Sequence, residues 1–416
     1  MRVTSKPLRT DLTPSRAFSA LAHHNAARGL PPPAMLSGDW FSARAVIAPS
    51  LAVSPSALPS FPPEADAGPG VIGGGWFGYL SYDSADPSGR TGALPASAWG
   101  WADHVLRWSA SGTCHLESLD GGGPTVAEME SLLASAPPPS SWTAGPLRRP
   151  LPSEHRDAVK ACVHAIEAGE LFQANVCTRF TGTFSGSSAA LFAAGVSTLS
   201  PRRAAYLAGP WGSVVSFSPE LFLCRDGRSV RSTPIKGTLP RRGPSDDGNA
   251  RLLRQSAKDV AENVMITDLV RNDLGRVCEV GSVTVPSLLQ VRPAPGVWHL
   301  DSTVTGVLRP SVSDADLLAA TFPPGSVTGA PKIRALDLIA SLEPCGRGVY
   351  TGTIGLVSPV AGLELNVAIR TFEIASGTVS LGVGGGITAD SDPEAEWQEC
   401  LHKAAPLERL LAGVEQ

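Results

Sequence analysis

The spacing of hydrophobic residues divides the chain into a first third of short strands and a longer remainder in which helices and strands alternate. Short apolar runs such as 45–48 and 75–82 lie between glycine or proline turns, a pattern that predicts short strands. The segment 136–152 is so rich in proline and serine that we predict neither helix nor strand within it. We place a boundary there, between segments 1–145 and 146–416. A long surface loop within one compact body would have the same composition.

Beyond this boundary, the best helix signal covers residues 256–274. Apolar residues that include Val264 and Leu269 recur there at helical spacing, and Gly275 follows as the expected C-cap. A glycine-rich stretch at 382–386 predicts a turn before the last helix. The other predicted elements are helices over 155–167 and 393–411 and strands over 171–180, 349–357, 363–374 and 378–383.

Composition then limits the class of protein. Hydrophobic residues make up 43% of the 416 positions, which is enough for a large core. The net charge of -4 comes without basic clusters, so a nucleic-acid partner is not expected. The seven cysteines form no C-x-x-C pair, which argues against a disulfide framework and a zinc site.

Neither a secretory signal nor a membrane span is predicted. Residues 1–10 carry positive charges without a following apolar core, and no apolar run approaches 18 residues. We therefore expect a soluble, cytoplasmic protein.

Two predicted helices each carry a pair of acidic residues three positions apart. Asp259 and Glu262 form one pair, and Glu396 and Glu399 form the other. Residues at this spacing share a helix face, so two facing helices would create an oxygen-rich pocket that suits Mg2+. Spacing alone also fits solvated helix faces. The glycine turn at 382–386, with a following helix N-terminus and Lys403, favours an anion site beside these acids.

Sequence motifs connect these features to a known family. The motifs cover about residues 150 to 404, with weaker N-terminal matches at 34–38 and 75–83. In order, they are 169–175, 218–222, 234–238, 257–275, 324–332, 350–352, 369–371 and 390–404. Together they resemble the chorismate-binding enzymes, which include anthranilate synthase component I, aminodeoxychorismate synthase component I, isochorismate synthase and salicylate synthase.

The resemblance implies an α+β fold, with two large, mostly antiparallel sheets packed face to face and helices outside. It also implies that Glu262 and Glu399 ligate Mg2+, with Asp259 and Glu396 as near neighbours. For substrate binding, it implies that the ring carboxylate of chorismate contacts Gly384, Gly385, Gly386 and Lys403, that the enolpyruvyl carboxylate contacts Tyr350 and Arg370, and that Gly237, Thr238 and Ser326 line the site.

Two positions select among the family's reactions. In similar isochorismate and salicylate synthases, a lysine acts as a base toward water at the position of Gln173 in this chain. Because glutamine cannot act as a base, water is disfavoured as the nucleophile here. At the second position, the motif of anthranilate synthases resembles Pro-Ile-Ala-Gly-Thr, whereas this chain has Lys236 in place of the alanine. The lysine form, with the Gly-Ser-Val-Thr-Gly loop at 325–329, is similar to aminodeoxychorismate synthases.

The resemblance implies amination of chorismate at C4 by two displacements. Neutral Lys236 attacks C2 while Glu220 protonates the departing C4 hydroxyl, and ammonia then expels the lysine. His299 matches a family histidine near that hydroxyl. No cysteine lies in the G-x-C-x-G pattern of a glutamine amidotransferase, so a partner subunit must supply ammonia from glutamine. A separate lyase would convert the product to 4-aminobenzoate, for folate or for a specialised metabolite.

Two alternatives remain open. One is anthranilate synthase component I, which differs in its product. The other is a non-catalytic paralogue that only scaffolds an amidotransferase. The joint presence of Glu220, Lys236, Glu262, Arg370 and Glu399 argues against the second.

Overall fold

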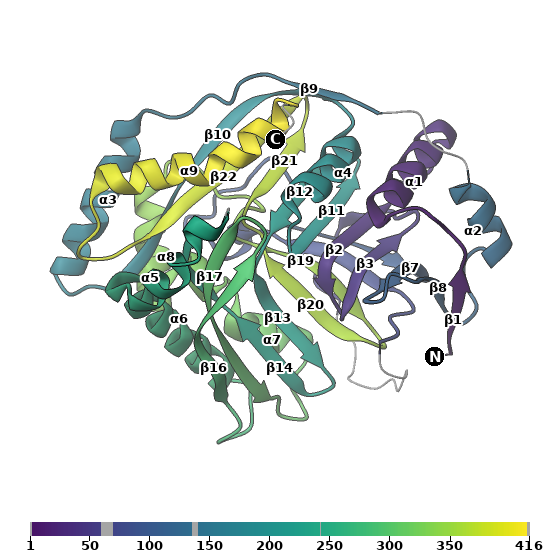
Figure 1. Cartoon of the computed structure of the whole chain (residues 1–416). Coiled ribbons are helices and arrows are strands. Elements are labelled where there is room, and N and C mark those ends of the chain that lie inside the picture. The colour runs from purple at the N-terminus through teal and green to yellow at the C-terminus, as the bar shows by residue number, and fades with distance from the viewer. Residues whose placement is uncertain (1, 60–69, 135–139, 242, 414–416) are drawn as a thin grey trace.

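Two large sheets lie face to face and helices cover their outer sides (Figure 1). The computed structural model describes residues 2–59, 70–134, 140–241 and 243–413. Neighbouring strands run antiparallel throughout both sheets of this described part. The predicted α+β architecture is therefore confirmed.

The first sheet runs through the whole width of the molecule, in the order β1-β8-β7-β3-β2-β11-β12-β21-β22-β10-β18, with β9 beside β10. Its strands are β1 (Val3–Leu8), β2 (Ala34–Trp40), β3 (Ala43–Ala48), β7 (His104–Ser109), β8 (Cys114–Leu119), β9 (Trp142–Ala144), β10 (Gln173–Gly186), β11 (Arg203–Gly209), β12 (Gly212–Ser218), β18 (Gly329–Ala330), β21 (Thr371–Ala375) and β22 (Thr378–Ile387).

The second sheet has the order β15-β17-β14-β13-β20-β19-β5-β6-β4, with β16 beside β17. Its strands are β4 (Ser54–Pro55), β5 (Gly75–Leu80), β6 (Ser97–Ala102), β13 (Leu221–Asp226), β14 (Ser229–Thr233), β15 (Ile235–Pro240), β16 (Thr284–Ala294), β17 (Val297–Val307), β19 (Thr353–Ser358) and β20 (Gly362–Val367). Both sheets combine strands from 1–145 with strands from 146–416, and the boundary between these segments stays a prediction.

The helices lie outside the sheets. They are α1 (Pro14–Arg28), α2 (Val126–Leu133), α3 (Pro152–Glu167), α4 (Ser188–Leu199), α5 (Asn249–Gln255), α6 (Ala257–Gly275), α7 (Asp314–Thr321), α8 (Lys332–Leu342) and α9 (Pro393–Leu411). Short 3-10 turns occupy Tyr82–Ala85, Pro244–Asp246 and Gly325–Val327. Within the described ranges, no helix combines the length and apolarity needed to cross a membrane.

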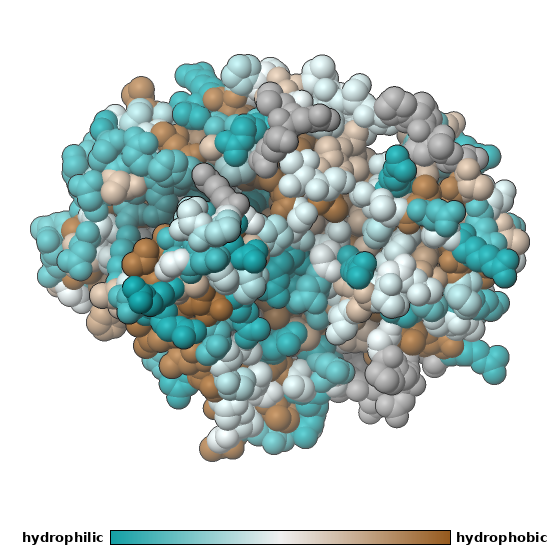
Figure 2. Space-filling model, viewed as in Figure 1, coloured by the Kyte–Doolittle hydropathy of each residue, from teal (hydrophilic) through white to brown (hydrophobic). Residues whose placement is uncertain are grey.

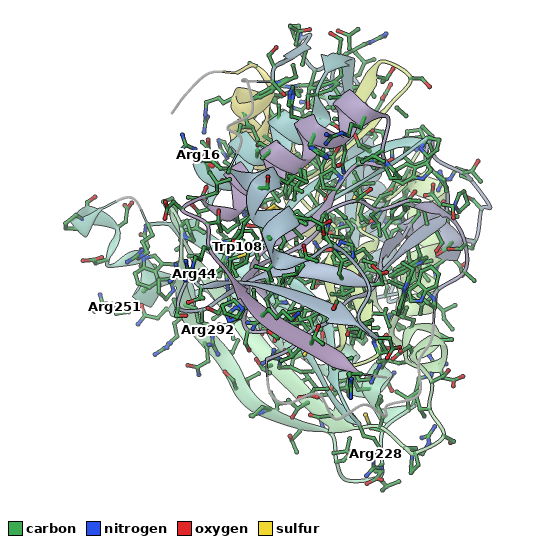
Figure 3. All side chains as sticks on the ribbon, turned by 90° about the vertical axis from the view of Figure 1, so that its right-hand side faces the viewer. Arg16, Arg44, Trp108, Arg228, Arg251 and Arg292 are labelled. Atoms are coloured by element: carbon green, nitrogen blue, oxygen red, sulfur yellow. The ribbon has the colours of Figure 1, made fainter. Side chains whose placement is uncertain are left out.

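Alternation along the strands creates one core between the sheets and others beneath the helices. On β2, Met35 points toward the core under α1 and α4, whereas Leu36 joins the core between the sheets with Phe77 of β5. Each large apolar side chain buried in this way contributes about 1.5–3 kcal/mol. Figure 3 views the N-terminal side, where Trp108 of β7 lies in the buried core and Arg16 lies at the surface.

The strongest helix predictions are confirmed. The predicted helix 393–411 coincides with α9, and 155–167 lies within α3. Ser256 caps the N-terminus of α6 through its side chain. The predicted glycine cap is wrong, because Gly275 is the last helical residue and Arg276 follows in helical conformation. Val264 was placed on the apolar side, yet it is 44% exposed.

Three loop and strand predictions are wrong. Segment 136–152 contains β9 and the start of α3, because a proline is tolerated at the first position of a helix. Residues 135–139 of that segment lie outside the described part. The predicted strand 349–357 starts only at β19, after a turn. The predicted strand 363–374 is split into β20 and β21.

The predicted glycine turn at 382–386 is also wrong. These residues belong to β22, where Gly384, Gly385 and Gly386 pair with β10. The anion site expected from a turn and the following helix N-terminus is therefore not formed in that way. The glycines serve another purpose, because they leave space for charged side chains to approach the strand.

A buried ion pair ties strand β10 of the first sheet to the loops beside it. Arg347 is 3% exposed, and its guanidinium donates to both carboxylate oxygens of Glu343 at 2.9 and 2.6 Å. It also donates to the carbonyl oxygens of Val327 and Asn175, at 2.7 and 2.6 Å. The ring of Tyr82 lies 4.5 Å below it. One side chain thus joins α8, β10 and the Gly325–Val327 turn.

We expect Arg347→Met to lower the free energy of unfolding by about 3–5 kcal/mol, because Glu343 would remain buried and unpaired. Urea unfolding followed by circular dichroism measures this loss. Arg156→Ala is the control, because its ion pair with Glu394 is exposed and contributes at most about 1 kcal/mol. Equal losses in the two variants would contradict the role given to Arg347.

Candidate active site

Charged side chains from α6, α9 and β15 meet over two glycines of β22. A Cβ atom on Gly386 would lie 3.0 Å from Nζ of Lys236, 3.1 Å from Oε2 of Glu262 and 3.2 Å from Nε2 of Gln173. A Cβ atom on the preceding Gly385 would meet another group, namely Glu396 at 3.0 Å, Glu399 at 3.7 Å and Lys403 at 3.8 Å. Any larger residue at either position would displace these groups.

Lysines neutralise the glutamates of this cluster. Lys236 lies 3.8 Å from Glu262, and Lys403 lies 2.7 Å from Glu399. The Lys403 ammonium also donates to the carbonyl oxygen of Gly384 at 2.8 Å. Burial raises the pKa of Glu262, against the opposing effect of Lys236. Burial acts in the same direction on Glu399, but Lys403 and more distant lysines lower its pKa overall.

Lys258 bridges the two acidic helices. Its ammonium lies 3.1 Å from Oε1 of Glu396 and 4.0 Å from Oε1 of Glu262. Ser391 donates to the same oxygen of Glu396 at 2.7 Å. The other oxygen, Oε2, is buried without a hydrogen-bond partner in the described part of the chain. Sequence reasoning gave Lys258 no role, although a lysine in the first turn of a helix opposes the helix dipole and could have drawn notice.

These acids suit a divalent cation by their chemistry. Carboxylate oxygens are the ligands that Mg2+ prefers, and one buried oxygen of Glu396 is unpaired. In the ranges that the structure describes, no three acidic, histidine or cysteine side chains converge closely enough to hold an ion, and lysines pair with the carboxylates. Asp259 faces Gly237, whose Cβ position would be 3.0 Å from its Oδ1. The metal ligands Glu262, Glu399, Asp259 and Glu396 stay predictions.

Glu220 has the environment of an acid that can hold a proton near neutral pH. It lies between β12 and β13, is 3% exposed and accepts a hydrogen bond from the backbone N–H of Ile235 at 3.3 Å. Burial raises its pKa to about 7, against the opposing effects of Ser326, Ile235, Lys236 and Arg370. The nearby Ser326 hydroxyl acts to lower the pKa of Glu220, although the hydroxyl oxygen has no hydrogen-bond partner among the described residues. Glu220 and Ser326 line the same small pocket.

His299 is buried and neutral. Its Nδ1 is 2.9 Å from the Thr238 hydroxyl on the paired strand β15, and its Nε2 has no partner among the described residues. Burial lowers the pKa of His299 to about 3, and Arg370 acts in the same direction. Gln173 is fully buried, and neither polar atom of its amide has a partner there. Unpaired buried polar groups are costly, so both residues are suited to a polar ligand.

Arg370 lies between β20 and β21, and Tyr350 lies in the turn that precedes β19. Arg370 has a φ of 53°, and its guanidinium makes no hydrogen bond or ion pair with any described residue. It is close enough to Glu220 and His299 to affect the pKa of each. Tyr350 is buried with its ring against Gly382, and its backbone N–H donates to Glu373 at 3.2 Å. Among the described interactions, no hydrogen bond joins Tyr350 to Arg370.

The outer surface around this region is mixed. Figure 2 shows hydrophilic residues over much of this face, interspersed with hydrophobic ones. The charged cluster between α6 and α9 combines the buried acids Glu262 and Glu396 with side chains that are about half exposed, namely Lys258, Glu399 and Lys403.

The two-sheet fold brings together a cluster of lysines and acids and, near Glu220, an arginine whose guanidinium has no hydrogen bond or ion pair among the described residues, and such groups suit a small anionic molecule. The chain belongs to the chorismate binding enzyme family, whose model matches residues 40–409.

Individual members of the family are similar to this chain over different shares of its length. Aminodeoxychorismate synthase component 1 of Escherichia coli is 42% identical over 253 residues, which cover 60% of this chain and 55% of that protein. Anthranilate synthase component 1 of Streptomyces coelicolor is 35% identical over 85% of this chain and 74% of its own length. The menaquinone-specific isochorismate synthase of E. coli has the same fold, with a TM-score of 0.75 and 21% identity over 99% of this chain and 94% of that one.

Replacement of Glu220 by glutamine tests whether burial keeps its carboxyl group protonated. The folded protein keeps a proton on Glu220 between about pH 4.5, the ordinary value, and about pH 7. Stability relative to Glu220→Gln should therefore fall by up to about 3 kcal/mol as pH rises through this window, because the unfolded state ionises first. Urea unfolding of both proteins at pH 5, 6, 7 and 8 measures the difference.

Glu167→Gln, at the exposed end of α3, reports the effect of removing a surface charge. A constant stability difference between wild type and Glu220→Gln across the pH range would show that Glu220 is not held protonated.

Proposed function

We propose that this protein aminates chorismate at C4 to give 4-amino-4-deoxychorismate, with ammonia from a glutamine amidotransferase subunit. The observation that carries the proposal is the position of Lys236. Its side chain is 10% exposed and its ammonium lies 3.8 Å from Glu262, over Gly386 and beside Gln173. A lysine amine buried beside a glutamate and a neutral amide is a suitable nucleophile once it has lost its proton.

Neighbouring residues support nitrogen rather than water as the incoming group. Gln173, with a buried and unpaired amide, cannot remove a proton from water. The similarity to aminodeoxychorismate synthase component 1 of E. coli agrees with this choice. That relative is matched over only about half of its length, so its activity supports this proposal without establishing it.

In the first displacement, Nζ of Lys236 forms a bond to C2 of chorismate as the C4–O bond breaks. Glu220 gives its proton to the departing hydroxyl, which leaves as water, and the ring double bond shifts. A pKa of about 7 makes Glu220 able to hold that proton at neutral pH and to release it in the reaction. His299, which is neutral, can accept or donate a hydrogen bond at the same hydroxyl.

In the second displacement, ammonia forms a bond to C4 and the C2–N bond to Lys236 breaks. The double bonds return to their positions, and a proton from the incoming nitrogen restores Glu220. The net change replaces hydroxyl by amine and releases water, and the enolpyruvyl group is retained. Lys236 is regenerated as the free amine.

Binding of the substrate would use the remaining charged groups. Arg370, whose guanidinium has no partner among described residues, would hold the enolpyruvyl carboxylate together with Tyr350. Lys403 and the Gly384–Gly386 strand would face the ring carboxylate. Gly237, Thr238 and Ser326 would complete the lining.

Glu262 and Glu399 would bind Mg2+, with Glu396 and Asp259 close by. The metal, when bound, would hold the ring carboxylate and help the C4 hydroxyl to leave.

The partner subunit follows from what the chain lacks. The sequence has no cysteine in a G-x-C-x-G pattern, and we infer that another protein releases the ammonia from glutamine. The product would pass to a lyase that forms 4-aminobenzoate, as in folate synthesis. The cytoplasmic location stays a prediction.

The second candidate is anthranilate synthase component I. It is favoured by the match to the Streptomyces coelicolor protein, which extends over 74% of that relative. The residue at 236 argues against it.

Incubation with chorismate, ammonium and Mg2+ followed by mass analysis tests the proposal. We expect 4-amino-4-deoxychorismate, which added lyase converts to 4-aminobenzoate, and no fluorescent anthranilate. Lys236→Ala should lower kcat roughly a thousandfold, because a nucleophile is removed. Lys160→Ala, an exposed lysine on α3, is the matched control.

Direct formation of anthranilate would establish the second candidate. Failure to bind chorismate, measured by calorimetry, would indicate a non-catalytic partner of an amidotransferase instead. Full turnover by Lys236→Ala would exclude the covalent route while leaving the product assignment intact.

A further inference from the structure

Lys258 holds the two acidic helices together without taking part in the proposed reaction. It belongs to the first turn of α6, and its ammonium reaches Glu396 of α9 at 3.1 Å and Glu262 of its own helix at 4.0 Å. Glu396 is 3% exposed, so this lysine is the charge that offsets a buried carboxylate.

The position of this lysine is locally unfavourable. The N-terminal turn of a helix carries a partial positive charge, and a cation there is disfavoured. Ser256 caps the same turn and Asp259 supplies an acid, as expected for a helix start, whereas Lys258 does not fit this pattern. A residue that breaks a local rule in a charged cluster points to a role outside the helix itself.

Other lysines of the region are fixed more firmly. Lys332 has three acceptors within 2.9 Å and is 14% exposed at its side chain. Lys236 is 10% exposed beneath the cluster. Lys403 is held by the carbonyl oxygen of Gly384 as well as by Glu399. Among the described residues, the Lys258 ammonium pairs only with carboxylates. Its side chain is 46% exposed, about as much as that of Lys403 at 45%, but no carbonyl oxygen holds it, so its ammonium can move into water.

Three ammonium groups offset the three glutamates of the cluster, and Asp259 adds one more acid beside Glu262. Glu262, Glu396 and Glu399 face Lys236, Lys258 and Lys403. A divalent cation that arrives here gains little unless one ammonium leaves, because like charges at short range oppose each other. The free oxygen of Glu396 lies on the same carboxylate that Lys258 holds.

We propose that Lys258 is a tethered cation that occupies the acidic cluster in the metal-free protein and moves away when Mg2+ binds. It stabilises the carboxylates before the metal arrives and weakens metal binding by competition. The inference rests on the proposed function only in placing Mg2+ between α6 and α9.

Calorimetric titration of the full chain with MgCl2, without chorismate, tests the inference. Lys258→Gln should bind Mg2+ roughly tenfold more tightly than wild type, as expected for removal of a unit charge about 6 Å from a divalent ion in water. Lys258→Arg should bind it no more tightly than wild type, because a guanidinium holds carboxylates at least as firmly. Lys160→Gln, on α3, should leave the affinity unchanged.

Thermal unfolding provides a second measurement on the same proteins. In EDTA, Lys258→Gln should melt below wild type, because Glu396 loses its partner, and Mg2+ should raise its melting temperature more than it raises that of wild type. Unchanged or weaker Mg2+ binding by Lys258→Gln would overturn the inference, as would tighter binding by Lys258→Arg. Neither result depends on the product, so a different product with these affinities would contradict only the proposed function.

Discussion

The catalytic half of the fold depends on the buried Arg347–Glu343 pair. A guanidinium taken out of water must have each donor satisfied, and here the acceptors come from α8, from β10 and from the turn that carries Ser326. Its geometry fixes how these three segments approach one another. The backbone N–H of Cys177 donates to the same glutamate at 2.8 Å, so β10 is held from two sides.

The pairing of β10 with β22 brings the residues of the candidate site together. The register places Asn175 opposite Gly386 and Val176 opposite Gly385, and the helices α6 and α9 close over the glycines. Because glycine has no side chain, glutamates and lysines from both helices can reach the strand. The strand supplies space, and the helices and β15 supply charge.

The acids of the site are kept in two electrostatic environments. Glu399 faces Lys403, which helps to lower its pKa, whereas burial raises the pKa of Glu262 against the opposing effect of Lys236. Glu220 is buried where desolvation outweighs its neighbours, so its proton is retained up to about pH 7. Such a division between a paired carboxylate and a proton-holding one is typical of sites that combine binding with proton transfer. Lys258 adds a further positive charge, on a side chain that is 46% exposed and paired with Glu396.

The sequence by itself determined the α+β class, the ends of α9, the paired acids on two helices and the family. These features depend on local spacing, on helix capping and on motifs that are contiguous in the chain. It misread residues 382–386 as a turn, because glycine marks turns and close approaches equally well. Which side chains approach Gly385 and Gly386, how Lys258 bridges Glu262 and Glu396, and how deeply Glu220 is buried were decided only by tertiary structure, since each depends on residues far apart in the chain.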